Sequence, residues 1–128
     1  MRRVLLCLVL MFSVVGCGSG SNNNNPFAGS WTGSWSDTTA ATTGTLAITI
    51  TNTGSISGTV TNTTASTTAS VIGTVNSGGQ FNATYEYSGA PETEVGYVNF
   101  GVTGQLQGNL TETQSGAVVG TAAISLVK

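Results

Sequence analysis

The carboxylates are the residues of this sequence that could carry acid–base chemistry, because the chain has no histidine. The five of them are Asp37, Glu86, Glu92, Glu94 and Glu112. Glycoside hydrolysis needs two facing carboxyl groups with different pKa values, and Glu92 and Glu94 are the one pair close in sequence. Two carboxylates are also too few for Ca²⁺, which takes about six to eight oxygen ligands. We therefore interpret Glu92 and Glu94 as residues of a solvated loop. Glu86 and Glu112 fall on the polar side of their predicted strands, where they would keep the protein soluble.

The sequence also lacks the residues that nucleophilic catalysis and nucleic-acid binding need. No serine has a base partner in a chain without histidine, so nucleophilic catalysis has no support. The basic residues are Arg2, Arg3 and Lys128, which leaves no basic surface to neutralise phosphates. The sequence therefore predicts a protein that is not an enzyme, binds no nucleic acid, and needs neither a metal nor a cofactor.

The aromatic residues are the other candidates for a site. Trp31, Trp35, Tyr85 and Phe100 could line a pocket for a small apolar ligand. A domain of this size also needs bulky side chains to fill its core, and the same residues can serve that purpose. Both interpretations stay open at this point.

The first residues have the pattern of a secretion signal. Arg2 and Arg3 precede an almost wholly apolar run from Val4 to Val15. Twelve helical residues rise only about 18 Å, whereas a hydrocarbon core is about 30 Å thick. The run therefore indicates the apolar region of a signal peptide and not a membrane-spanning helix.

The run ends at Val14-Val15-Gly16-Cys17, which resembles the lipobox of bacterial lipoproteins. The resemblance implies that residues 1–16 are removed and that Cys17 becomes an acylated N-terminus. Two or three acyl chains anchor a protein stably in a membrane. Gly18 stands where an inner-membrane retention signal has Asp, so the resemblance favours the outer membrane. The alternative is a secreted protein with an unrelated cysteine near its cleavage site.

Residues 17–26 comprise this cysteine and a linker that reads GSGSNNNNP. Gly, Ser and Asn cannot bury enough surface to offset the entropy of ordering them, which indicates a flexible tether. Residues 27–128 would then form one domain. Because Cys7 lies in the removed peptide and Cys17 is acylated, the mature protein would have no thiol for a disulfide.

This domain has the period of β-strands and an internal repeat. Apolar and polar residues alternate, for example from Leu46 to Thr51. Four glycines recur every 25 residues, at Gly29, Gly54, Gly79 and Gly104. Each opens a first strand, and second strands follow near 44–51, 69–76, 94–102 and 116–127. Four hairpins predict an all-β fold, an eight-stranded antiparallel up-and-down β-barrel closed by its first and last strands. A two-sheet β-sandwich is the alternative.

The first strand also resembles that of calycins, the lipocalin and avidin families. Gly29-Ser30-Trp31, repeated as Gly33-Ser34-Trp35, is similar to the Gly-x-Trp that opens their first strand. The hairpin 53–60 is similar to the second and third strands of avidin-like proteins. Lipocalins close the barrel base with a cation packed on the Trp, and here the domain offers only Lys128. Because no tryptophan follows Trp35, the resemblance implies the barrel and not the biotin site of avidins.

Together these features predict a lipid-anchored, non-enzymatic lipoprotein of the bacterial envelope. Its acyl chains on Cys17 would bind the membrane, and its barrel would be an interaction or structural module for another envelope protein. The alternative is a calycin-like carrier of a small apolar ligand inside the barrel.

Overall fold

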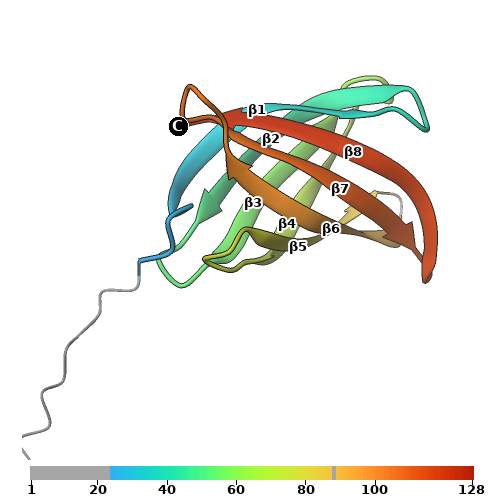
Figure 1. Cartoon of the computed structure of the whole chain (residues 1–128). Coiled ribbons are helices and arrows are strands. Elements are labelled where there is room, and N and C mark those ends of the chain that lie inside the picture. The colour runs from blue at the N-terminus through green and yellow to red at the C-terminus, as the bar shows by residue number, and fades with distance from the viewer. Residues whose placement is uncertain (1–23, 88) are drawn as a thin grey trace, which may run out of the picture.

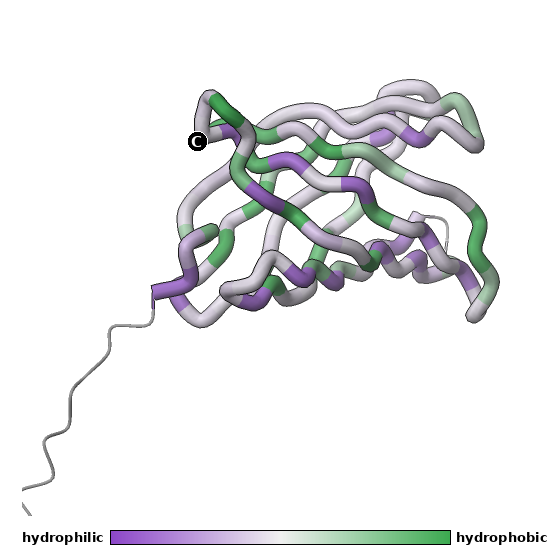
Figure 2. The backbone as a smooth tube through the Cα atoms, in the orientation of Figure 1, coloured by the Kyte–Doolittle hydropathy of each residue, from purple (hydrophilic) through white to green (hydrophobic). Residues whose placement is uncertain are grey.

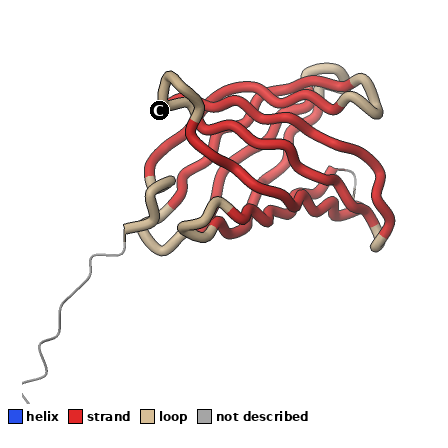
Figure 3. Tube along the Cα trace, viewed as in Figure 1, coloured by secondary structure: helices blue, strands red, loops and turns tan. Residues whose placement is uncertain are grey.

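The computed structural model describes residues 24–87 and 89–128. The predicted signal peptide, the lipidation site Cys17 and the tether as far as residue 23 lie outside the described residues. Across these two ranges no helix is long and apolar enough to cross a membrane. The described chain folds into strands joined by short loops (Figure 3).

The strands form one closed antiparallel barrel (Figure 1). In chain order they are β1 (Gly29–Asp37), β2 (Thr42–Ile50), β3 (Ser55–Asn62), β4 (Thr67–Val75), β5 (Gln80–Tyr87), β6 (Ala90–Phe100), β7 (Leu106–Gln114) and β8 (Ala117–Val127). Each strand pairs with its sequence neighbours, and β1 also pairs with β8 from Thr32↔Val127 to Asp37↔Ala122. The predicted eight-stranded up-and-down barrel is therefore confirmed, and the sandwich alternative is wrong.

The 25-residue repeat corresponds to one turn used three times. Gly54, Gly79 and Gly104 have φ values of 86°, 85° and 77°, a region that glycine adopts without steric cost. Each donates its N–H to the carbonyl three residues earlier, at 2.9, 3.0 and 3.0 Å. The repeated glycine thus sets the connections β2–β3, β4–β5 and β6–β7, all of which lie at the same end of the barrel (Figure 1).

The interior is packed by the inward phase of every strand. Hydrophobic and polar residues alternate along the backbone (Figure 2), and the buried core includes Trp31, Phe81, Leu106 and Leu126. Glycines on the inward phase let neighbouring strands approach closely. A Cβ at Gly58, for example, would collide with the carbonyl oxygen of Ala47 and lie 2.7 Å from Ile48 Cα.

The end that carries the three repeated turns is closed, and we call it the base. Asn25, which the composition assigned to the tether, is buried there and donates from Nδ2 to the carbonyl of Val75 at 2.7 Å. Trp31 Nε1 donates to the carbonyl of Phe27 at 2.8 Å, and the Phe27 and Phe100 rings stack at 5.0 Å. Lys128 Nζ lies 5.0 Å from the centroid of the Trp31 ring. The one basic residue of the domain therefore packs on the tryptophan. The sequence did not predict this contact, because the lack of any other basic residue in the domain is a departure from the lipocalin pattern.

Candidate functional site

The opposite end of the barrel is open, and we call it the mouth. The loops β1–β2, β3–β4, β5–β6 and β7–β8 surround it (Figure 1). It holds a cavity of about 230 Å³. Strand side chains line most of this cavity, among them Trp35, Asp37, Asn62, Tyr85, Tyr87, Glu92, Glu112 and Gln114.

Four of the five carboxylates of the chain belong to the inner face at this end. Asp37 closes β1, Glu92 and Glu94 lie on β6, and Glu112 lies on β7. Asp37 and Glu112 are only 6% and 5% exposed, and Glu94 lines a small void just inside the mouth. Lys128, at the base, is the sole basic residue from residue 24 onward.

Two interpretations from the sequence are corrected by this arrangement. Glu92 and Glu94 are not in a solvated loop, because β6 begins at Ala90; Pro91 lies near the strand start, where a missing N–H is tolerated. Glu112 is not on the polar phase, because it shares the inward phase of β7 with Leu106 and Leu110. Glu86 is exposed on β5, as the alternation predicted.

Hydrogen bonds hold these carboxylates in place. Asp37 Oδ1 accepts from the backbone N–H groups of Thr39 and Ala40 at 2.6 and 3.2 Å, which ties it to the β1–β2 loop. Tyr85 Oη donates to Glu112 Oε1 at 3.1 Å across the interior. The Gln114 amide donates to Glu92 Oε1 at 3.4 Å.

The carboxyl groups also lie against one another. Glu94 and Glu112 are cross-strand partners in the β6–β7 register, where like charges destabilise a sheet. Gly120 of β8 leaves room for a second pair of carboxylates, Glu112 and Asp37. A Cβ at this glycine would stand 2.5 Å from Glu112 Oε2 and 2.9 Å from Asp37 Oδ2. Asp37, Glu94 and Glu112, which we call the carboxyl cluster, thus lie close together without a basic neighbour.

Burial and mutual repulsion alter the titration of this cluster. Burial, together with the negative charge of Glu112, raises the pKa of Glu94 to about 8. Burial and the charge of Asp37 likewise raise the pKa of Glu112, although the hydrogen bond from Tyr85 opposes this. Burial and the surrounding glutamates raise the pKa of Tyr87 to about 12, so this phenol keeps its proton. Near neutral pH the mouth therefore holds protons that ordinary carboxyl groups would have lost.

The four aromatic residues predicted as ligand-binding do not form a single site. Trp31 and Phe100 lie together at the base with ring centroids 6.0 Å apart, and Trp31 is only 1% exposed. Trp35 and Tyr85 lie at the mouth and line both its cavity and the void beneath it. That void measures about 10 Å³, the room that a single water needs, whereas ligand pockets measure about 300 to 1,000 Å³.

The mouth also contains an unsatisfied polar group. Tyr87 Oη is buried and, within residues 24–87 and 89–128, is the one such side-chain atom without a hydrogen-bond partner. Its ring packs edge-on against Tyr85 at 5.2 Å. Buried polar groups normally have a partner, so this hydroxyl has hydrogen-bonding capacity that the protein itself does not use.

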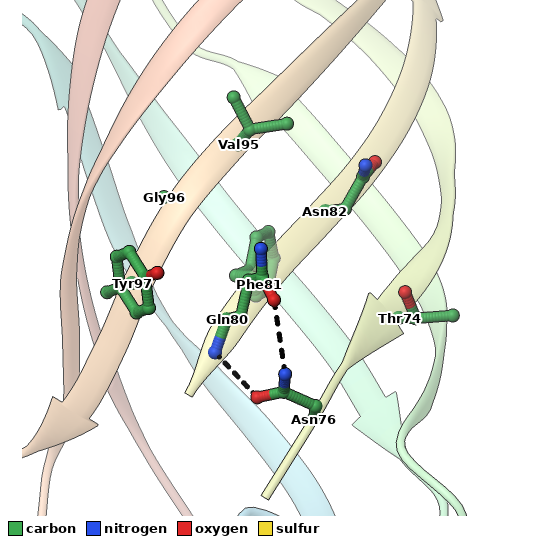
Figure 4. Close-up of a pocket in the computed structure, with 8 residues that line it drawn as sticks. All are labelled: Thr74, Asn76, Gln80, Phe81, Asn82, Val95, Gly96 and Tyr97. Carbon is green, nitrogen blue, oxygen red and sulfur yellow. Dashed lines mark hydrogen bonds between the residues drawn. The ribbon is translucent and has the colours of Figure 1, made fainter. Parts of the chain in front are cut away.

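A second depression lies on the outer face of β4–β6 and offers less chemistry (Figure 4). Asn76 and Gln80 satisfy one another there, with Asn76 Nδ2 donating to Gln80 Oε1 at 3.2 Å. Tyr97 is 68% exposed beside Val95, and no carboxylate or basic residue lines this groove. The mouth is therefore the stronger candidate.

Within the described ranges, no group of three or more Asp, Glu, Cys or His residues has the geometry of a metal site. Comparison with protein-family models, curated proteins and solved structures finds no match for the chain. The closed antiparallel barrel is consistent with a calycin-like architecture.

Proposed function

We propose that this chain is a lipid-anchored, non-enzymatic lipoprotein of the bacterial envelope, most suitably of the outer membrane, whose barrel is an interaction module. Its contact site is the mouth, and the group that enters is a small organic cation such as an ammonium. The observation that carries the proposal is the set of inward carboxylates around a cavity of about 230 Å³, at an end where residues 24–87 and 89–128 place no basic side chain.

The two ends of the barrel suit an anchored module. Residue 24, where the described chain begins, lies at the base, so a tether to an acylated Cys17 would enter at that end (Figure 1). The mouth would then face away from the membrane surface. A partner in the periplasm or outside the cell could reach it without contact with lipid.

Charge and aromatic rings support a cationic ligand. An ammonium that replaces the shared protons of the carboxyl cluster would form charge-assisted hydrogen bonds, which are stronger than neutral ones. Trp35, Tyr85 and Tyr87 border the same cavity and present rings that attract cations. The unpartnered Tyr87 hydroxyl adds an acceptor for an N–H group.

Two features support a binding role without catalysis or an apolar cargo. Asp37 and Glu112 lie side by side over Gly120, whereas a glycosidase needs two carboxyl groups on either side of a substrate. The interior beside Trp31 is packed, and the void under the mouth holds no more than a water. These observations favour the interaction module over a carrier of apolar ligands.

The ligand class is tested by titrating the full chain, in detergent micelles, with n-butylammonium and with n-butanol as a neutral match. We expect the ammonium alone to shift the Trp35 indole N–H signal in NMR spectra, with the Trp31 signal unchanged. Glu112→Gln should weaken binding at least tenfold, since a hydrogen bond to a charged group contributes about 1.5–3 kcal/mol. Glu86→Gln, on the outer face, is the matched control. Equal shifts with butanol would contradict a cation site.

The anchor is tested separately by labelling cells with radioactive palmitate. We expect the wild-type chain and Cys7→Ser to carry label in the membrane fraction and Cys17→Ser to carry none. Label on Cys17→Ser as strong as on the wild type would contradict the lipoprotein assignment and leave the mouth proposal intact.

A further inference from the structure

The mouth contains an element that is held on one side only. β8 pairs with β1 from Ala122 onward, whereas Ala117, Val118, Gly120 and Thr121 have their strand partners on β7. The register between β7 and β8 shifts at Glu112/Thr113. Residues 113–121 therefore form a hairpin tip, which we call the β7–β8 tip, that extends beyond the closing seam of the barrel.

The β7 side of this tip is held by β6, through strand pairs as far as Gln114 and a hydrogen bond from Thr113 Oγ1 to the carbonyl of Thr93 at 3.2 Å. Few contacts besides the carboxyl cluster hold its β8 side against β1. Val118 and Val119 of the tip are 70% and 42% exposed, so its apolar packing is limited. The last backbone bond of the seam, from Thr38 N to Thr121 O, is long at 3.4 Å. The shorter side-chain link runs from Glu112, at the root of the tip, to Tyr85 on β5 at 3.1 Å.

We infer that the carboxyl cluster is a proton-operated latch, which holds the β8 side of the β7–β8 tip against β1 while Glu94 and Glu112 are protonated and releases it when these protons are lost. A protonated Glu112 can donate a hydrogen bond to Asp37, because oxygens of the two side chains converge over Gly120. Deprotonated, the same oxygens repel one another, and Glu94 repels Glu112 from the paired position on β6.

The surroundings of the cluster offer no compensating charge. The titratable side chains that face it are Asp37 from β1, Tyr85 and Tyr87 from β5, Glu92 and Glu94 from β6, and Glu112 from β7. The inward residues of β2, β3, β4 and β8 at this level are not titratable; they include Gly44, Asn62, Ala69 and Gly120. Every ionisation inside the mouth therefore adds negative charge to negative charge.

The direction of the pH effect follows from linkage. The pKa of Glu94 is raised from about 4.5 to about 8 in the folded protein. Between these two values the folded chain binds more protons than the unfolded chain, so the free energy of unfolding falls as pH rises. The loss begins near pH 4.5 and is complete once pH has passed about 8. Any opening that exposes Glu94 to water shares this dependence, whereas an opening confined to the base does not.

The two tryptophans are built-in reporters for the two ends. Trp35 Nε1 donates to the carbonyl of Thr61 at the mouth at 3.2 Å, and Trp31 Nε1 donates to Phe27 at the base. The test measures hydrogen exchange of both indole N–H groups between pH 6 and 9 in the ligand-free full chain, corrected for intrinsic exchange. We expect protection of Trp35 to fall at least tenfold more than that of Trp31, whose exchange requires the domain to unfold because its ring is 1% exposed.

Conservative variants separate the latch from general unfolding. Glu112→Gln and Glu94→Gln imitate the protonated acid, so each should preserve Trp35 protection at pH 9. Glu86→Gln should behave as the wild type. The inference is overturned if both indoles lose protection together, if neither does, or if the Gln variants follow the wild-type profile. Because no cation is present, this outcome does not depend on whether the mouth binds an ammonium.

Discussion

The base and the mouth are two ends of one barrel that are closed by opposite means. At the base, Asn25 satisfies backbone groups and the aromatic rings of Phe27 and Trp31 exclude water. At the mouth, Asp37 and Glu112 occupy positions of the same inward phase, and a cavity of about 230 Å³ remains open. The base therefore has the contacts that stabilise a fold, and the mouth has groups whose burial is unfavourable unless protons or a partner neutralise them.

This division is informative about where function resides. A carboxylate in an apolar setting lowers stability, so a cluster of them at one end indicates a role other than folding. The inward carboxylates lie at the end opposite the first described residues, and so at the greatest reach from a predicted anchor. The residues that stabilise the domain thus lie at the base, and the residues that could bind a ligand lie at the mouth of the same barrel.

The strongest test of the comparison removes one tryptophan from each end. Trp31→Ala should lower the free energy of unfolding by about 3–5 kcal/mol, a large share of the 5–15 kcal/mol that is usual for a domain. Trp35→Ala should cost distinctly less, because Trp35 already borders the mouth cavity and the void beneath it. Urea unfolding of both variants, followed by circular dichroism, provides the measurement. A Trp31→Ala protein that melts within a few degrees of the wild type would refute the division.

A second pair of substitutions compares two glycines with close neighbours. Gly58 lies against the backbone of β2 in the body of the barrel, and Gly120 lies against carboxylate side chains at the mouth. In Gly58→Ala the new methyl collides with the backbone of β2, so we expect a loss of about 1–3 kcal/mol or more. In Gly120→Ala it meets only the ends of the Glu112 and Asp37 side chains, which can move. Thermal unfolding at pH 5 should show the smaller loss for Gly120→Ala. The reverse order would mean that the carboxyl cluster is rigidly packed.

The third prediction concerns the charge of the mouth alone. Glu112→Gln should raise the free energy of unfolding at pH 9, because burial and the charge of Asp37 raise the pKa of Glu112 and so penalise its ionised form. The gain should be smaller at pH 5, because a lower pH favours the acid form, which resembles the amide. Urea unfolding at both pH values, with Glu86→Gln as the exposed control, measures the difference. A Glu112→Gln variant that is less stable than the wild type at pH 9 would contradict it.

The barrel could be predicted from sequence because both of its signals are local. Alternation identifies a strand from its own residues, and the glycine every 25 residues marks the same turn three times. The closure of β1 on β8 then follows, since a meander of eight strands removes its exposed edges only in this way.

The carboxyl cluster was missed for two different reasons. The phase of Leu106 and Leu110 places Glu112 inward, so strict use of the alternation would have found it. Glu94 was assigned to a loop because Ala90-Pro91 has the composition of a turn, although β6 already begins there. The convergence of Asp37 with Glu112 depends on the stagger of β1 against β7 across β8, and no local pattern reports that stagger.

The smallest expected effect concerns the single cation of the domain, and it tests whether the base needs charge at all. Lys128 Nζ lies over the Trp31 ring at 5.0 Å, and the absence of a Cβ at Gly29 leaves room for its side chain. At an exposed site such a contact contributes about 0.5–1 kcal/mol. Lys128→Met keeps much of the apolar side chain and removes the charge, so it should lower the melting temperature slightly, and Lys128→Arg should preserve it. Differential scanning calorimetry at low and high salt resolves the change, because salt screens the charge of the exposed Lys128. If Lys128→Met and Lys128→Arg destabilise equally, the base is closed by packing on Trp31 and not by charge. The base would then differ even more from the mouth, which is lined by carboxylates.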